Sequence, residues 1–70
     1  MNLSEKILYC RKKAGLSQEA LAEKLGVSRQ AVSKWETGAA DPSTANLLAL
    51  AKLYGVSPEE LLRNAQSEDV

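Results

Sequence analysis

The stretch from Gln18 to Thr37, QEALAEKLGVSRQAVSKWET, decides the fold of this 70-residue chain. Apolar residues recur at helical spacing on either side of the short segment 26–28, Gly-Val-Ser. Gly26 tolerates the positive φ that a tight turn needs, and Ser28 is a favoured residue type for capping the next helix. The pattern therefore predicts two short amphipathic helices joined by a tight turn. The inward positions are Leu21, Ala22, Leu25, Val27, Val32 and Trp35.

Capping signals predict one helix before this pair. Asn2, followed three residues later by Glu5, has the spacing of a capping box, and Gly15 is placed to end the helix. Ser17 then caps the helix that begins the decisive stretch. The apolar stripe of the first helix consists of Leu3, Ile7, Cys10 and Ala14.

Two more helices are predicted after the loop at residues 39–43. The fourth ends at Gly55, and the fifth begins at the sequence Ser57-Pro58-Glu59-Glu60, which has an N-cap, a proline at the first helical position and a capping-box glutamate. Their apolar positions are Leu47, Leu50, Ala51, Tyr54, Leu61 and Leu62. We therefore expect an all-α, compact five-helix domain over residues 1–66, with a frayed tail at 67–70.

Composition excludes several classes of function. The chain has one Cys and no His, which excludes an internal disulfide framework and a His/Cys zinc site. It has no Gly-rich phosphate loop, and 70 residues leave no room for a sizeable pocket. We expect no metal, no cofactor, no small-molecule ligand and no enzymatic activity. No apolar run approaches the length of a membrane span, so we expect no membrane contact and a cytoplasmic location.

Charge is divided unevenly along the chain, although the net charge is zero. Residues 1–35 carry seven basic and three acidic side chains, and residues 36–70 carry two basic and six acidic ones. This polarity suits a domain that turns one face toward phosphates and another away from them. A solvated surface with chance segregation of charge is the alternative.

The outward positions of the third helix are Arg29, Gln30, Ser33 and Lys34. All four side chains can form hydrogen bonds and none is acidic. Arginine pairs with the major-groove edge of guanine, and glutamine pairs with that of adenine. We expect these four residues to contact DNA bases, with Lys34 reaching a phosphate as the alternative. Ser17 and Gln18, at the N-terminus of the second helix, are placed to hold a phosphate.

A linked set of motifs resembles the Cro/CI-type helix-turn-helix family of phage and bacterial repressors, also called the XRE family. The set comprises Gly15-Leu16-Ser17-Gln18, Leu21-Ala22, Leu25-Gly26-Val27-Ser28, Val32-Ser33-Lys34-Trp35-Glu36, Gly38, Pro42 and Leu53-Tyr54-Gly55-Val56-Ser57. The resemblance covers residues 3–62. It implies a lambda-repressor-like domain that binds double-stranded DNA and regulates transcription, most often as a repressor.

The resemblance also implies roles for individual residues. It places the recognition helix at about residues 29–36, in the major groove, and adds Ser28 and Thr37 to the phosphate contacts. It implies that Gln18 clamps a phosphate and can help to read an outer base pair, and Gln18→Ala is expected to weaken binding to all sites alike. Arg11 and Glu36 match an ion pair of the family. A homodimer on a palindromic operator is the expected assembly.

The sequence departs from the family pattern at residues 39–41, where Ala-Ala-Asp replaces a loop that is often basic. This loop and the zero net charge motivate a second hypothesis, a protein-interaction module such as an antitoxin or adaptor with the same fold. In that case Arg29 and Gln30 would be ordinary solvent-facing residues. Leu61 and Leu62 would then matter most, although both hypotheses allow these leucines to be either core or dimer surface.

Two residues invite functional roles that their positions argue against. Trp35 could stack on nucleic acid, but its place on the inward stripe favours core packing. Cys10 could be a redox switch, but a lone cysteine on an apolar helix face is more often a small buried hydrophobe. We interpret both as structural.

Overall fold

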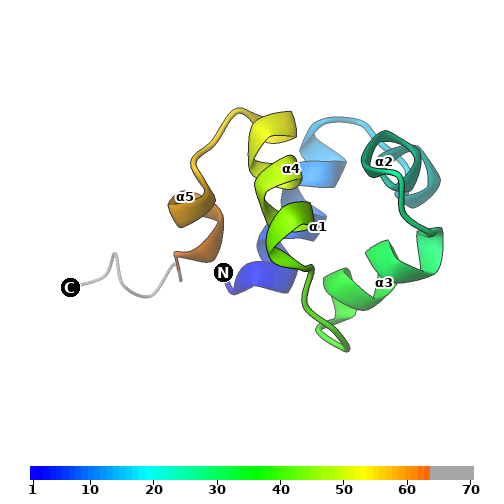
Figure 1. Ribbon diagram of the computed structural model, residues 1–70, viewed down its shortest axis with the longest axis horizontal. Coiled ribbons are helices and arrows are strands. Elements are labelled where there is room, and N and C mark those ends of the chain that lie inside the picture. The colour runs from blue at the N-terminus through cyan, green and yellow to red at the C-terminus, as the bar shows by residue number, and fades with distance from the viewer. Residues whose placement is uncertain (64–70) are drawn as a thin grey trace.

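The computed structural model describes residues 1–63, and every regular element in that range is a helix (Figure 1). The elements are α1 (Leu3–Lys13), α2 (Gln18–Leu25), α3 (Arg29–Thr37), α4 (Thr44–Tyr54) and α5 (Pro58–Leu62). The all-α, five-helix prediction is confirmed for this range. The expected domain end at residue 66 and the expected tail at residues 67–70 lie outside the described residues.

The helix starts follow the capping chemistry expected from the sequence. The Asn2 side chain accepts a hydrogen bond from the Glu5 backbone N–H at 2.9 Å, and the Glu5 carboxylate accepts one from the Asn2 N–H at 3.0 Å. Ser57 and Glu60 form the same reciprocal pair at the start of α5. Each cap satisfies donors that have no partner inside the helix, which fixes where the helix begins.

The turn between α2 and α3 depends on Gly26. Its φ is +71°, in the left-handed region, and its N–H donates to the carbonyl groups of the last turn of α2. The next N–H, of Val27, donates to the Ala22 carbonyl at 3.0 Å. These bonds close the end of α2 and redirect the chain within three residues, which fixes the angle between α2 and α3.

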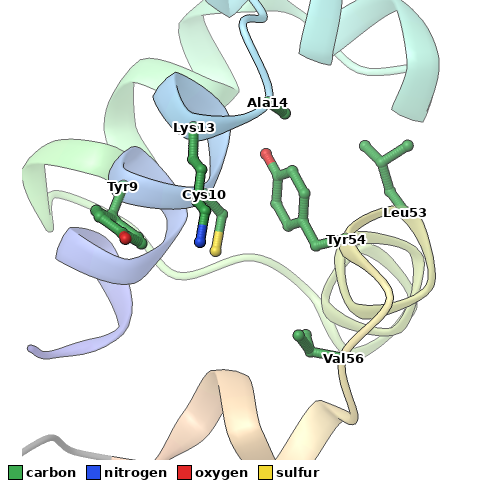
Figure 2. A pocket seen from close by; sticks show the side chains of 7 residues that line it. All are labelled: Tyr9, Cys10, Lys13, Ala14, Leu53, Tyr54 and Val56. Atoms are coloured by element: carbon green, nitrogen blue, oxygen red, sulfur yellow. The ribbon is translucent and has the colours of Figure 1, made fainter.

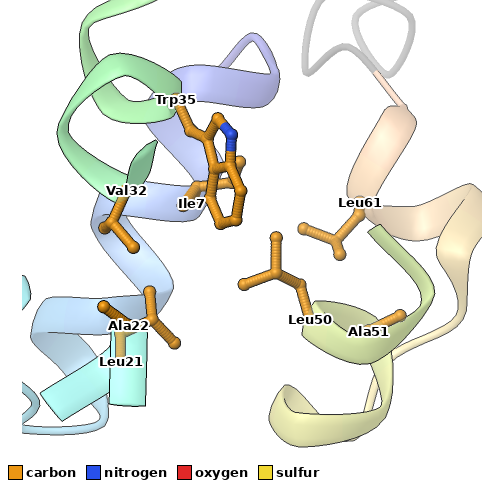
Figure 3. Close-up of a cluster of buried hydrophobic side chains, with 8 residues drawn as sticks. All are labelled: Ile7, Leu21, Ala22, Val32, Trp35, Leu50, Ala51 and Leu61. Carbon is orange, nitrogen blue, oxygen red and sulfur yellow. The ribbon is translucent and has the colours of Figure 1, made fainter. Parts of the chain in front are cut away.

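One apolar core joins all five described helices (Figure 3). Its buried members are Ile7, Leu21, Ala22, Val32, Trp35, Leu50, Ala51 and Leu61. Trp35 is 5% exposed, which confirms its interpretation as a core residue. Ala22 is buried on α2, the helix that packs against α3, where a small side chain allows close approach. The core therefore holds α2 and α3 on the rest of the domain.

Some residues that were predicted to point inward are exposed or only partly buried, so those predictions are wrong. Ala14 is exposed because α1 ends at Lys13, and Cys10 is only partly buried at the edge of a hollow between α1 and α4. On α5, Leu61 is in the core whereas Leu62 is 55% exposed. Successive helical residues point about 100° apart, and α5 turns Leu61 toward the core, which leaves Leu62 on the solvent side. Leu25, Val27 and Tyr54 pack against the core but are only partly buried.

The hollow between α1 and α4 has a volume of about 440 Å³ (Figure 2). Tyr9, Cys10 and Lys13 of α1 and Leu53 and Tyr54 of α4 line it, and the Tyr54 ring extends toward α1. Burial raises the pKa of the Cys10 thiol, and the nearby Lys13 and Lys6 only partly offset this effect. A raised thiol pKa lowers the thiolate fraction, which argues against a redox switch at Cys10.

The Tyr54 hydroxyl is buried and has no hydrogen-bond partner within residues 1–63. Burial raises the pKa of Tyr54 to about 12, because ionisation would place a charge in a poorly solvated site. A buried hydroxyl without a partner also costs free energy in the neutral form.

We expect Leu50→Ala to lower the free energy of unfolding by about 2–5 kcal/mol, because it leaves a cavity at the centre of the core. Leu48 lies on the same helix and is 51% exposed, so Leu48→Ala is the matched control and should change stability by less than about 1 kcal/mol. Urea unfolding followed by circular dichroism measures both. Equal losses in the two variants would contradict the assigned core.

We expect Tyr54→Phe to leave stability at neutral pH unchanged or to raise it by about 1 kcal/mol, because it removes the unpaired hydroxyl. Because the folded-state pKa is raised, the unfolded chain releases this proton first, and the domain loses stability as pH rises from 10 to about 12. Tyr54→Phe should flatten this loss. Thermal unfolding between pH 9 and 12 provides the measurement, and identical alkaline profiles for both proteins would refute the assignment.

Candidate nucleic-acid interface

The outer edge of α3 is a polar surface that no other described element covers. Arg29, Gln30 and Lys34 are exposed, whereas Val32 and Trp35 on the opposite side of the helix are buried. Ser33 is only partly buried, so it lies at the border between the two faces and not fully outward as expected. In Figure 1, α3 lies at one end of the molecule, with α2 beside it and α5 at the far end.

The expected phosphate contacts flank this edge. The Ser17 and Ser28 hydroxyl oxygens accept hydrogen bonds from Ala20 N–H at 3.0 Å and Ala31 N–H at 3.1 Å. Each serine therefore caps its helix with a lone pair and keeps an O–H to donate. The first backbone N–H groups of α2 have no partner inside the helix and suit an anion. Thr37 is exposed at the end of α3, and its hydroxyl donates to the Lys34 carbonyl at 3.3 Å.

Arg11 and Glu36 form a tightly enclosed ion pair between α1 and α3. Arg11 Nε donates to Glu36 Oε2 at 2.6 Å and Arg11 Nη2 donates to Oε1 at 3.1 Å. Their side chains are 12% and 4% exposed. Arg11 Nη1 also donates to the Leu16 carbonyl at 2.8 Å, and the hydrogen bond with Glu36 raises the pKa of the arginine. The pair thus holds three parts of the chain in one arrangement: α1, α3 and the loop that precedes α2.

Gln18 connects this ion pair to the exposed edge. Its Nε2 donates to Glu36 Oε1 at 2.9 Å, and its Oε1 accepts a long hydrogen bond of 3.4 Å from Arg29 Nη1. Gln18 and Arg29 were both expected at the interface, but neither their contact with each other nor that of Gln18 with Glu36 was predicted from the sequence. No local pattern signals these contacts, because the paired residues lie 11 and 18 positions apart.

Among residues 1–63 there is no group of three or more acidic or cysteine side chains that could hold a metal ion. None of the helices in the same range is both long enough and apolar enough to cross a membrane.

A family model described as "Helix-turn-helix" matches residues 7–61, which include all of α2 and α3. The crystal structure of the P22 c2 repressor in complex with synthetic operator 9T superposes with a TM-score of 0.84, at 41% sequence identity, over 90% of this chain and 96% of that one. The chain belongs to the Cro/CI-type helix-turn-helix family. This family consists of DNA-binding transcriptional regulators.

Two curated relatives are longer proteins, and each contains one region that is similar to this chain. Repressor protein C2 of Salmonella phage P22 is 41% identical over 66 residues, 94% of this chain and 31% of that protein. The HTH-type transcriptional activator BcrR of Enterococcus faecalis is 44% identical over 62 residues, 89% of this chain and 30% of that protein. The chain thus spans about a third of the length of these relatives.

We expect Glu36→Ala to lower the free energy of unfolding by about 3 kcal/mol or more, because it leaves the enclosed Arg11 guanidinium without its partner. Glu19→Ala removes an exposed carboxylate from α2 and is the matched control, with an expected change below about 1 kcal/mol. Guanidinium chloride unfolding of both variants makes the comparison. A Glu36 variant as stable as the control would mean that the ion pair does not hold the helices together.

Proposed function

We propose that this domain binds double-stranded DNA sequence-specifically with α3 in the major groove, as the DNA-binding part of a transcriptional repressor. The observation that carries the proposal is the uncovered polar edge of α3, opposite its buried apolar side. The operator complex of the similar P22 c2 repressor supports it. A regulator of this kind acts where the DNA is, so we propose a cytoplasmic location and assign no enzymatic activity, cofactor or small-molecule ligand.

The proposed base contacts come from Arg29 and Gln30, with Ser33 and Lys34 further along the helix. Arginine can donate two hydrogen bonds to guanine O6 and N7, and glutamine can pair with adenine N6 and N7. Ser33 is partly buried, so it can reach a base only from the border of the polar edge of α3. Contacts of these kinds discriminate between base pairs by roughly 1–3 kcal/mol each.

The proposed phosphate contacts come from both sides of the recognition helix. Ser17 and Gln18 lie at the N-terminus of α2, where free backbone N–H groups and the helix dipole favour an anion. Ser28 and Thr37 lie at the two ends of α3. Such contacts fix the position of the helix on DNA and carry no sequence information themselves.

We propose that the domain, residues 1–66, binds as a homodimer to a palindromic operator. Two-fold dimers of helix-turn-helix proteins place their recognition helices about 34 Å apart, one turn of DNA. Because Leu61 is in the core, the exposed Leu62 is the fifth-helix leucine that can take part in a dimer surface.

Fluorescence anisotropy with duplexes enriched from a random pool, at two salt concentrations, tests the proposal. We expect Arg29→Ala and Gln30→Ala each to reduce discrimination at one base pair by about five-fold to 100-fold. Lys52→Ala removes an exposed cation from α4 and should leave discrimination intact. If Arg29→Glu bound every duplex as tightly as the wild type, the DNA proposal would fail. A protein-interaction module would then be the better description.

A further inference from the structure

We propose that Lys6 is a positioning residue for the dimer surface on α5: its ammonium group closes the C-terminal end of α5 and so fixes the direction in which Leu62 faces the second copy. This inference rests on the proposed function, which places a homodimer on a palindromic operator, and deepens it. It gives a residue of α1, the helix farthest in sequence from α5, a role in pairing two copies.

The end of α5 differs from the ends of the three helices before it. Each of α2, α3 and α4 ends at a glycine with positive φ, whose own N–H donates to a carbonyl group of the last turn. Helix α5 ends instead at Arg63, whose backbone is extended, and its last turn carries no basic side chain. Because the last carbonyl groups of a helix have no partner inside it, α5 needs a donor from another part of the chain.

Lys6 of α1 provides this donor. Its Nζ donates to the Glu60 carbonyl at 2.6 Å and also donates to the Arg63 carbonyl. The Arg63 N–H donates to the Glu59 carbonyl at 2.9 Å, which completes the last turn. The helix dipole also favours a cation at this end of a helix. Figure 1 shows the start of α1 beside α5, so the fold brings together residues that lie 54 and 57 positions apart.

Apolar packing alone determines the direction of α5 only weakly. The helix has five residues, and Leu61 is its one buried side chain. A hollow of about 200 Å³ lies between α1 and α5, lined in part by Tyr9 and Val56. A helix this short is not stable by itself, and one buried side chain fixes a point of contact but no rotation about it. The hydrogen bonds from Lys6 supply the second point of contact.

The rotation of α5 decides where Leu62 points. Leu62 follows the buried Leu61 and is 55% exposed. Since the directions of successive helical residues are fixed at about 100° apart, any rotation of α5 moves both leucines together. A surface that is fixed before the second copy arrives loses less conformational entropy on pairing. Lys6 therefore acts on pairing through α5 and needs no contact of its own with the second copy.

The experiment measures the advantage of a palindrome over a half-site. Fluorescence anisotropy compares the affinity for an enriched duplex with two half-sites with that for a duplex with one. We expect Lys6→Met to reduce this advantage by about tenfold, roughly what hydrogen bonds from one charged group contribute to an equilibrium constant. Affinity for the single half-site and discrimination between base pairs should stay within about two-fold, because α3 lies at the other end of the molecule.

Lys12→Met is the matched control, since it removes the same charge from an exposed position of α1. It should retain the palindrome advantage of the wild type. Lys6→Arg should restore most of that advantage, because a guanidinium also donates to two carbonyl groups. Amide hydrogen exchange gives a local measurement: in Lys6→Met the Arg63 amide should exchange about tenfold faster, whereas the exchange of the Trp35 amide in α3 should not change.

A double-mutant cycle connects Lys6 with the surface that it positions. In a Leu62→Ala background, Lys6→Met should lower the palindrome advantage by less than it does in the wild-type background. Thermal unfolding verifies that each variant is folded. Lys6→Gln, which keeps N–H donors without the charge, takes the place of Lys6→Met if the methionine variant is unfolded.

An unchanged palindrome advantage in Lys6→Met would overturn the positioning role. Equal losses of affinity for the half-site and the palindrome would overturn it too, since they would identify Lys6 as a residue that only stabilises the fold. If the wild type bound both duplexes equally, the dimer part of the proposed function would fail, and the positioning role with it. Indifference of the wild type to base sequence would instead contradict the DNA proposal itself.

Discussion

The ion pair between Arg11 and Glu36 is the constraint on which the arrangement of this domain depends. It joins the end of α1 to the end of α3 with two hydrogen bonds, and a third reaches the Leu16 carbonyl before α2. Enclosing two charges costs solvation, and only near-ideal geometry with further hydrogen bonds offsets that cost. The geometry of the pair thus restricts the helices to one relative position, and Gln18 extends that restriction to the exposed edge.

The third helix, α3, has two faces with different roles. Val32 and Trp35 bury one face in the core, and Arg29 and Gln30 expose the other. The turn at Gly26 and the small side chain of Ala22 hold α2 against the buried face, so no other described helix covers the exposed face, and Gln18 of α2 contacts it only at Arg29. A recognition helix needs this combination, because it must be rigidly held and yet project outward.

The basic and acidic halves of the chain form different helices of the fold. The basic half supplies α1, α2 and most of α3, and the acidic residues Glu59 and Glu60 lie on α5. Figure 1 places α5 and α3 at opposite ends of the long axis. The acidic side chains of α5 therefore lie away from a polyanion bound at α3, although α2 and α3 themselves carry equal numbers of basic and acidic side chains, Lys24, Arg29 and Lys34 against Glu19, Glu23 and Glu36.

The sequence by itself determined the helices, because caps such as Asn2 and Ser57, and turn glycines such as Gly26, act on neighbours within four residues. It also assigned Trp35 to the core through helical periodicity. Only the tertiary structure decided that Leu61 is buried while Leu62 is exposed, and that Cys10 lies at the edge of a hollow. It alone joined Gln18 to Glu36 and Arg29, because hydrogen bonds between residues far apart in the chain depend on how whole helices pack.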